Sequence, residues 1–297
     1  MIALLVLIWG TTWAAITIGL RGIPPLTGVA LRFSIAGAAL LALVPVFRIK
    51  LGTTTPRERL VWGTNTLFTF CLSYSILYWA EQWVPSGLAA VLFATFPLLV
   101  ALFAHFLLPG ERLTPASGLG ILVGFLGVAV IFSEDFDALL GPQVAFAAAV
   151  ALLCPFFSAL GSVLVKKWGS GIHPLSTAAV PMLLCGVIMG PIAWLTEADR
   201  GVTFDRTSVL ALLYLALVGS AVPFTIYFWL LKRLPATQLS LINYAVPVVA
   251  VIVGAVLLDE PVTLRVILGT VLVIAGVAVS MRPGKKAEAP ATPTVEG

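Results

Sequence analysis

The chain has 297 residues, of which 60% are hydrophobic and 10% are charged. About a quarter of the residues in soluble domains are charged, so this composition excludes an ordinary soluble protein and indicates one that lies in a lipid bilayer. The net charge of +4 is too small to indicate a nucleic-acid partner. The three cysteines lie in apolar stretches without a CxxC pair or a histidine cluster, so we expect no disulfide framework, no metal and no cofactor.

Long uncharged runs predict transmembrane helices, because about 20 mostly apolar residues are needed to cross a bilayer. Polar residues within the runs recur at spacings of three and four rather than two, so we expect an all-α integral membrane protein rather than a barrel. The ten predicted spans, in chain order, are 2–20, 26–47, 60–80, 85–108, 114–132, 143–165, 174–196, 207–231, 235–257 and 262–281.

Basic residues are divided unevenly between the two sides of this layout. Of the 17 Lys and Arg residues, Arg32 lies within a span, four lie on the side opposite the N-terminus and the other twelve lie on the same side as the N-terminus. The positive-inside rule therefore predicts that both termini are cytoplasmic and that the number of helices is even. The acidic run at 134–137 then faces outside, and the tail at 283–297 is predicted to be disordered.

The second half of the chain repeats the first. Pro97 lies 150 residues before Pro247, and the sequence GVAV at 127–130 recurs at 276–279. Several matches at a nearly constant offset indicate an internal repeat. Each unit contains five helices, an odd number, so the second unit is predicted to be inverted in the membrane, as in transporters that alternate access to a central site. The predicted units are residues 1–133 and 143–282.

Three motifs carry a family resemblance: WGTTW in the first helix, PLTGVALRF at the start of the second, and AEQWVPSGLAAVLFATFPL from the third helix into the fourth. With the doubled layout, they resemble the EamA family of the drug/metabolite transporter superfamily, over essentially the whole chain to Met281. The resemblance implies an inner-membrane exporter of small metabolites such as amino acids. It also implies a central cavity lined chiefly by helices 1, 3, 4, 6, 8 and 9.

Arg32 is the only basic residue well inside a predicted span, where an arginine costs about 2.5 to 3.5 kcal/mol on insertion scales. Glu81, near the outer end of the third helix, is its expected partner. In one interpretation, either residue or both contact a charged or zwitterionic solute. In the other, the two residues clamp helices 2 and 3 together, or Arg32 extends to the interface. Glu81 is also the candidate proton carrier if export is driven by protons.

Polar and aromatic side chains share one face of the third helix. Tyr74, Tyr78 and Glu81 stand at positions i, i+4 and i+7, which places them on one stripe. Such a stripe should face protein or water rather than lipid. An interfacial aromatic belt is the alternative, and it is the preferred interpretation for Trp79 and Trp83.

Faces of helices 1, 8 and 9 supply the remaining predicted cavity wall. A mid-membrane asparagine needs a partner for its amide, which is either a neighbouring helix or a substrate. Aromatic walls with a few hydroxyl groups suit amphipathic solutes. These predicted wall residues are Trp9, Thr12, Trp13, Tyr227, Asn243 and Tyr244.

Four prolines, Pro97, Pro155, Pro223 and Pro247, lie within predicted helices, where each removes a backbone donor. The resulting kinks are interpreted as gating hinges, as sites of exposed carbonyl ligands or as static bends. A GxxxG pair, Gly120 with Gly124, indicates close helix packing, either inside the chain or in a homodimer.

An embedded enzyme is the main alternative class. Intramembrane enzymes need a nucleophile with its base, a metal cluster or paired acidic motifs, and the sequence contains none of these, so we expect a transporter rather than an enzyme. The candidate substrates are amino acids, other small metabolites and amphipathic drugs. The expected partners are such a small molecule, the bilayer and, in a driven cycle, protons.

Overall fold

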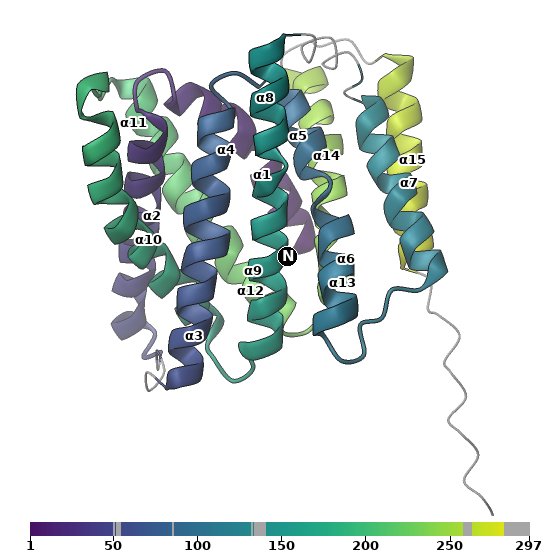
Figure 1. The fold of residues 1–297 in the computed structure, drawn as a ribbon, viewed down its shortest axis with the longest axis horizontal. Helices are drawn as coiled ribbons and strands as arrows, with labels where there is room; N and C mark the ends of the chain where they lie inside the picture. The colour runs from purple at the N-terminus through teal and green to yellow at the C-terminus, as the bar shows by residue number, and fades with distance from the viewer. Residues whose placement is uncertain are drawn as a thin grey trace, which may run out of the picture.

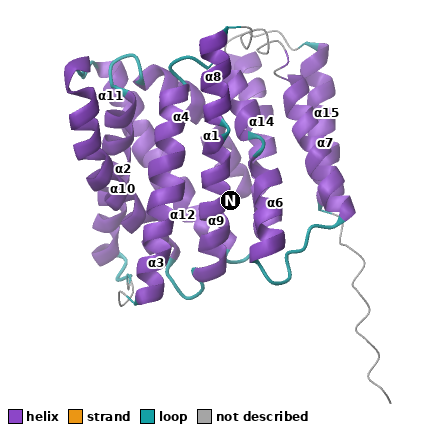
Figure 2. Cartoon of the chain, viewed as in Figure 1, coloured by secondary structure: helices purple, strands orange, loops and turns teal. Residues whose placement is uncertain are grey.

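The computed structural model describes residues 1–49, 51, 55–84, 86–131, 133, 141–257 and 263–281. Within these residues, all regular secondary structure is helical, and the helices run alongside one another in a single bundle (Figures 1 and 2). The acidic run at 134–137, Pro85 and the tail at 283–297 lie outside the described residues. We refer below to the upper and lower ends of the bundle as drawn in Figure 1.

The described residues of the first half form seven α-helices and one π-helical segment. They are α1 (Ile2–Gly19), α2 (Pro25–Val46), α3 (Pro56–Thr64), η1 (Asn65–Ser73, π), α4 (Tyr74–Ala80), α5 (Ser86–Phe93), α6 (Phe96–Leu107) and α7 (Pro115–Ile131).

In the second half, the part of the chain that the structure describes forms eight α-helices, one short 3₁₀ turn and one π-helical segment. They are α8 (Pro142–Ala151), α9 (Leu153–Trp168), α10 (Pro174–Glu197), η3 (Ala198–Arg200, 3₁₀), α11 (Arg206–Leu213), η4 (Tyr214–Ala221, π), α12 (Val222–Leu231), α13 (Ala236–Ser240), α14 (Ile242–Leu257) and α15 (Leu264–Ser280).

Seven helical stretches among the described residues are long and apolar enough to cross a membrane. They are Ile2–Gly19, Pro25–Val46, Pro56–Ala80, Leu88–Leu107, Pro142–Trp168, Pro174–Arg200 and Arg206–Leu231. Three shorter apolar helices accompany them, at Pro115–Ile131, Ala236–Val249 and Leu264–Ser280. The prediction of an all-helical, multi-pass membrane protein is therefore confirmed.

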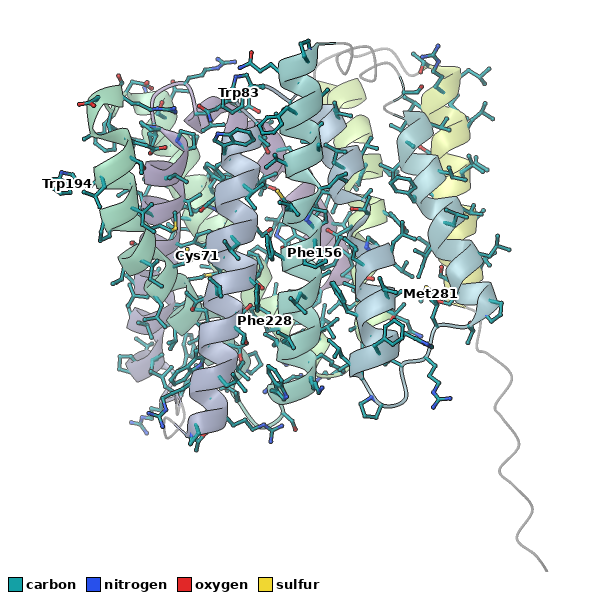
Figure 3. The ribbon with its side chains drawn as sticks, in the orientation of Figure 1. Cys71, Trp83, Phe156, Trp194, Phe228 and Met281 are labelled. Carbon is teal, nitrogen blue, oxygen red and sulfur yellow. The ribbon has the colours of Figure 1, made fainter. Side chains whose placement is uncertain are left out.

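Large apolar side chains cover the outside of the bundle. Trp194 is 73% exposed and points away from the bundle (Figure 3), and Phe106 is 74% exposed. Such exposure is unfavourable in water, and it is the surface expected of helices that face lipid tails.

Two helix pairs approach each other closely through glycine, and each pair combines one helix from each half. In the pair α2 and α10, a Cβ at Gly37 would lie 2.6 Å from the backbone nitrogen of Leu183. In the pair α7 and α15, a Cβ at Gly127 would lie 2.6 Å from the nitrogen of Val273. Small residues allow backbones to meet at such distances. Gly120 and Gly124 belong to this second contact, so the GxxxG pair packs inside the chain.

Two π-helical segments occupy matching places in the two halves. Each one interrupts a long stretch, η1 within Pro56–Ala80 and η4 within Arg206–Leu231. η1 packs on α10 and η4 packs on α2, so each segment contacts the opposite half. In the first of these contacts, Asn65 Nδ2 donates to the carbonyl of Thr177 at 2.9 Å. Wide π turns are rare and are frequently found at functional sites.

Short turns break three other predicted spans within the described residues. The breaks lie at 94–95 between α5 and α6, at Leu152 between α8 and α9, and at Leu241 between α13 and α14. Pro97 and Pro155 closely follow the first two breaks, since a proline disfavours helix in the residues before it. Pro223 lies in the first turn of α12 directly after η4, and Pro247 lies within α14.

Candidate functional site

A cavity of about 80 Å³ lies between the helices of the two halves. At about 15 Å³ for each water molecule, it has room for about five. We call it the central cavity. Its walls come from α1, α2, η1, α4, α5 and α6 of the first half and from α9, α12 and α14 of the second.

Seven of the ten residues predicted to contact substrate line the central cavity. They are Trp9, Thr12, Trp13, Arg32, Tyr74, Tyr227 and Asn243. The other three, Tyr78, Glu81 and Tyr244, do not line it. The structure therefore brings most of the predicted set together from five different elements.

The guanidinium of Arg32 is fully enclosed and held from three sides. The residue is 1% exposed. Its Nε donates to Ser220 Oγ at 2.8 Å, one Nη donates to the Tyr78 hydroxyl at 3.1 Å, and the other donates to the Gly219 carbonyl at 3.3 Å. The ring of Tyr74 adds a cation–π contact, with its centroid 4.9 Å from Cζ. Four residues from opposite halves thus fix one positive charge in the cavity wall.

The predicted ion pair between Arg32 and Glu81 is absent. Neither carboxylate oxygen of Glu81 has a hydrogen-bond partner in the described structure, although the residue is only 8% exposed. Three of the five N–H donors of Arg32 instead bind Ser220, Tyr78 and Gly219. A buried carboxylate without a partner is costly, so Glu81 is a group to which a cation or a proton would bind favourably.

Tyr244 lies away from the cavity because α14 directs this side chain toward α7. The residue is 0% exposed, and its hydroxyl donates to the Ile121 carbonyl of α7 at 2.8 Å. Its ring covers Gly124, where a Cβ would lie 2.7 Å from the ring. Neighbouring positions on a helix point about 100° apart, so Asn243 faces the cavity while Tyr244 faces α7.

Hydroxyl groups that the sequence analysis missed form part of the wall. Ser73 donates to the Cys154 carbonyl at 2.9 Å and lies 2.9 Å from Ser158 Oγ. The Tyr227 hydroxyl donates to Ser162 Oγ at 3.1 Å. Ser158 and Ser162 stand four residues apart on α9, which is the same stripe signal that identified Tyr74 and Tyr78.

Two polar atoms at the cavity have no hydrogen-bond partner in the described structure. They are the indole Nε1 of Trp9 and Oγ1 of Thr69. Thr69 lies in η1 and is 4% exposed. Gly161 of α9 allows Thr69 this position, because a Cβ at residue 161 would collide with Oγ1. Unpaired buried polar atoms are rare in native proteins and require an explanation.

Aromatic rings supply the apolar part of the wall. The Trp9 ring lies 5.7 Å from that of Phe224 and 5.7 Å from that of Tyr227, and the Trp13 ring lies 5.9 Å from that of Phe93. Phe93 and Phe224 line the cavity as well. The cavity therefore presents one fixed cation, several hydroxyls and edge-on or tilted aromatic rings, which is the composition of a small-molecule site.

The described structure is that of a multi-pass membrane protein with a small-molecule cavity between its two halves. A family model described as the EamA-like transporter family matches residues 1–133 and 145–282. The chain belongs to this family, and the resemblance of its motifs to EamA is confirmed.

Relatives span nearly the same length as this chain. The uncharacterized transporter YoaV of Bacillus subtilis (strain 168) is 28% identical over 277 residues, which cover 91% of this chain and 92% of that protein. Protein PagO of Salmonella typhimurium is 30% identical, covering 82% of this chain and 80% of its own. A probable amino-acid metabolite efflux pump of Escherichia coli (strain K12) is 28% identical, and the match covers 94% of this chain and 92% of that protein.

A solved crystal structure has the same fold. Its TM-score to this chain is 0.79, with 24% sequence identity, and the match covers 93% of this chain and 94% of that one.

Proposed function

We propose that the chain exports small metabolites, amino acids or related compounds, across the inner (plasma) membrane by alternating access. The observation that carries the proposal is the central cavity, because both halves line it and Arg32 is buried in its wall without a carboxylate partner among the described residues. A guanidinium held in one orientation is well suited to bind a carboxylate. The carboxylate of an amino acid fits that chemistry.

The proposed layout has ten crossings in two inverted five-helix halves, 1–133 and 143–282, with both termini in the cytoplasm. Three observations support it. The shorter apolar helices fall at the predicted spans that the seven long ones leave out. The family model matches the chain twice, once in each half. The π-helical segments η1 and η4 occupy corresponding places.

Outward release would require the upper end of the bundle to open. There, Glu197 of α10 accepts hydrogen bonds from the backbone nitrogens of Leu26 at 3.0 Å and Thr27 at 2.8 Å, at the start of α2. The nitrogen of Thr203 donates to the Gly22 carbonyl at 2.8 Å. These bonds join the two halves across the proposed exit. In the proposed cycle they break when the halves rock apart and form again on return.

Glu81 is the proposed proton carrier in a driven cycle. Its buried carboxylate has no hydrogen-bond partner among the described residues, and a carboxylate of this kind can take up a proton on one side and release it on the other. The variant Glu81→Gln tests this role. Transport against a gradient that remains intact and sensitive to external pH in this variant would remove Glu81 from coupling.

Efflux of amphipathic drugs is the second candidate function. The observation that favours it is the aromatic wall formed by Trp9, Trp13, Phe93 and Phe224, because aromatic side chains bind many flat, apolar solutes without strict polar matching.

Efflux from cells that overproduce the protein separates these candidates. The cells are loaded with labelled amino acids or with cationic dyes. The variants are Arg32→Gln and Trp9→Phe, and Trp194→Phe on the lipid-facing surface is the control. Amino-acid efflux that both cavity variants slow, at equal protein levels, supports the proposal. Dye efflux that survives Arg32→Gln favours drug transport, and no efflux of either class by folded protein contradicts both.

A further inference from the structure

A second cavity lies at the lower end of the bundle, apart from the central cavity. We call it the basic cavity. Its volume is about 270 Å³. The end of α9, the connection 169–173, the first turn of α10 and the end of α12 form its wall. The wall contains Lys166 and Lys232 together with the apolar side chains of Val165, Phe228 and Leu231. Figure 3 labels Phe228 in the lower half of the bundle.

The ammonium group of Lys166 is fixed at the end of α12. Its Nζ donates to the carbonyls of Leu231 at 2.7 Å and Leu234 at 2.9 Å. Leu231 is the last residue of α12, and its carbonyl is one that a helix end leaves without an intrahelical donor. Lys166 therefore caps α12, and its bond to Leu234 holds the connection that follows. An ammonium group has three protons, so one donor of Lys166 is left for a ligand.

The positive charge of Lys232 is not compensated by any described residue. Its side chain is exposed and forms no ion pair in the described part of the chain. Partial burial of its ammonium group and the neighbouring guanidinium of Arg233 lower the pKa of Lys232. Burial and the charge of Lys232 likewise lower the pKa of His173, at the start of α10. Cations that repel one another in this way form a region of positive potential, where an anion is stabilised.

The connection after α9 adds backbone donors to the basic cavity. Ser170 and Gly171 line it, and their N–H groups have no acceptor among the described residues. Gly171 has a φ of +87°, which a residue with a Cβ rarely adopts. Successive free N–H groups in such a turn bind anions well.

Aromatic side chains with basic neighbours flank the basic cavity. Lys167 Nζ lies 5.8 Å from the Trp168 ring centroid, and Arg233 Cζ lies 3.6 Å from that of Trp229. Tryptophan with lysine or arginine is the combination found at the level of lipid headgroups. The cationic rim of the cavity therefore lies at a level of the bundle that suits lipid headgroups.

We propose that the basic cavity binds the phosphate of an anionic phospholipid headgroup, with Lys166, Lys232 and the N–H groups of Ser170 and Gly171 as its donors. Basic pockets between transmembrane helices are sites of this kind. Inorganic phosphate shares the anion chemistry, but it does not account for the tryptophan rings that lie beside Lys167 and Arg233. The site lies within the second half of the chain and is separate from the solute site proposed above.

Binding is measured on the purified, delipidated full chain in detergent. Phosphatidylglycerol, phosphatidylcholine or inorganic phosphate is added, and both Tm and the phospholipid retained after repurification are recorded. The variants are Lys232→Ala and Lys232→Glu, and Arg112→Glu is the control because Arg112 is exposed and does not line the cavity. We expect phosphatidylglycerol alone to raise Tm, and Lys232→Glu to raise its half-saturating concentration about tenfold or more.

Three results would overturn the proposal. The first is an equal response to phosphatidylcholine. The second is a phosphatidylglycerol response that is the same in Lys232→Glu, Lys232→Ala and the natural chain. The third is a response to inorganic phosphate that Lys232→Glu abolishes while phosphatidylglycerol gives none, which would assign the cavity to a free anion. None of these measurements involves transport, so their outcome is independent of the proposed function.

Discussion

Nε of Arg32 in α2 donates to Oγ of Ser220 in η4 at 2.8 Å, and the same hydroxyl donates to the Leu215 carbonyl at 2.8 Å. The second bond reaches back five residues, which is the spacing of a π turn. The wide turn therefore positions the hydroxyl group that accepts the hydrogen bond from Arg32. A charged donor from the first half and a backbone carbonyl of the second half are joined through one oxygen atom.

Replacing Arg32 by lysine should reduce export at least about tenfold at equal protein levels. A lysine cannot form the three directed bonds to Ser220, Tyr78 and Gly219, and leaving their oxygen atoms unpaired costs about 1 to 3 kcal/mol each. Initial efflux rates in intact cells measure the effect. The exposed Arg21→Lys is the control, and a loss of the same size in Arg21→Lys would show that the site is not responsible.

Thr69 should contribute a hydroxyl to solute binding. The variant Thr69→Val keeps the shape and removes the oxygen, so we expect it to raise KM for export about fivefold, the equivalent of one hydrogen bond of about 1 kcal/mol. Thr69→Ser should retain most of the affinity, because it keeps the hydroxyl. Concentration-dependent efflux in vesicles gives KM for both variants, and equal KM values would exclude a role for Oγ1.

The contact between α7 and α15 should tolerate no added methyl group. A Cβ at Gly127 would lie 2.6 Å from the nitrogen of Val273 and 2.7 Å from the carbonyl of Gly269. We expect Gly127→Ala to lower stability by about 1 to 3 kcal/mol, because the backbones must separate. A Cβ at Gly118 in the same helix would lie 3.9 Å from its nearest neighbouring atom, so Gly118→Ala should leave Tm unchanged. Thermal unfolding in detergent distinguishes the two variants.

The two ends of the bundle should be labelled from opposite sides of the membrane. Ser170 and Asp199 are exposed near opposite ends of α10, and the natural cysteines are buried. In intact cells, an impermeant maleimide should modify Asp199→Cys and should reach Ser170→Cys only after permeabilisation. The reverse pattern would show that the chain has the opposite orientation in the membrane. Modification of both cysteine variants from outside would contradict the proposed layout.

Acid should weaken the cap of α11. Hydrogen bonds from the backbone and hydroxyl of Ser208 lower the pKa of Asp205 below its ordinary value of 3.8. The ionised cap therefore stabilises the fold above that ordinary pKa, and the stabilisation is lost as the pH falls through the lowered one. The Tm difference between the natural chain and Asp205→Ala should be constant near neutral pH and shrink below about pH 4. A difference that grows in acid would contradict this assignment.

Helix positions could be predicted from the sequence because prolines and charges mark the ends of apolar runs. The first two helices were predicted at 2–20 and 26–47, and they lie at Ile2–Gly19 and Pro25–Val46. Periodicity also identified stripes, such as Tyr74 with Tyr78, since it depends only on spacing along one helix.

Contacts between helices could not be predicted in this way, because spacing does not fix how a helix is rotated against its neighbours. Asn243 and Tyr244 were therefore assigned to one wall, although the structure separates them. The partner of Arg32 was expected to be a carboxylate, whereas a hydroxyl exposed by a π turn takes that place. No residue pattern within Tyr214–Ala221 indicates a π turn.

The distance along the chain between Arg32 and Ser220 has a consequence for biosynthesis. The two residues are 188 positions apart, which at about 5 to 20 residues per second corresponds to roughly 10 to 40 seconds of translation. During that interval α2 has left the ribosome, but the main acceptor of its guanidinium has not been made. We expect the nascent α2 to stay beside the insertion machinery, or close to water, until the second half arrives. A chain truncated before η4 should therefore be removed by membrane proteases.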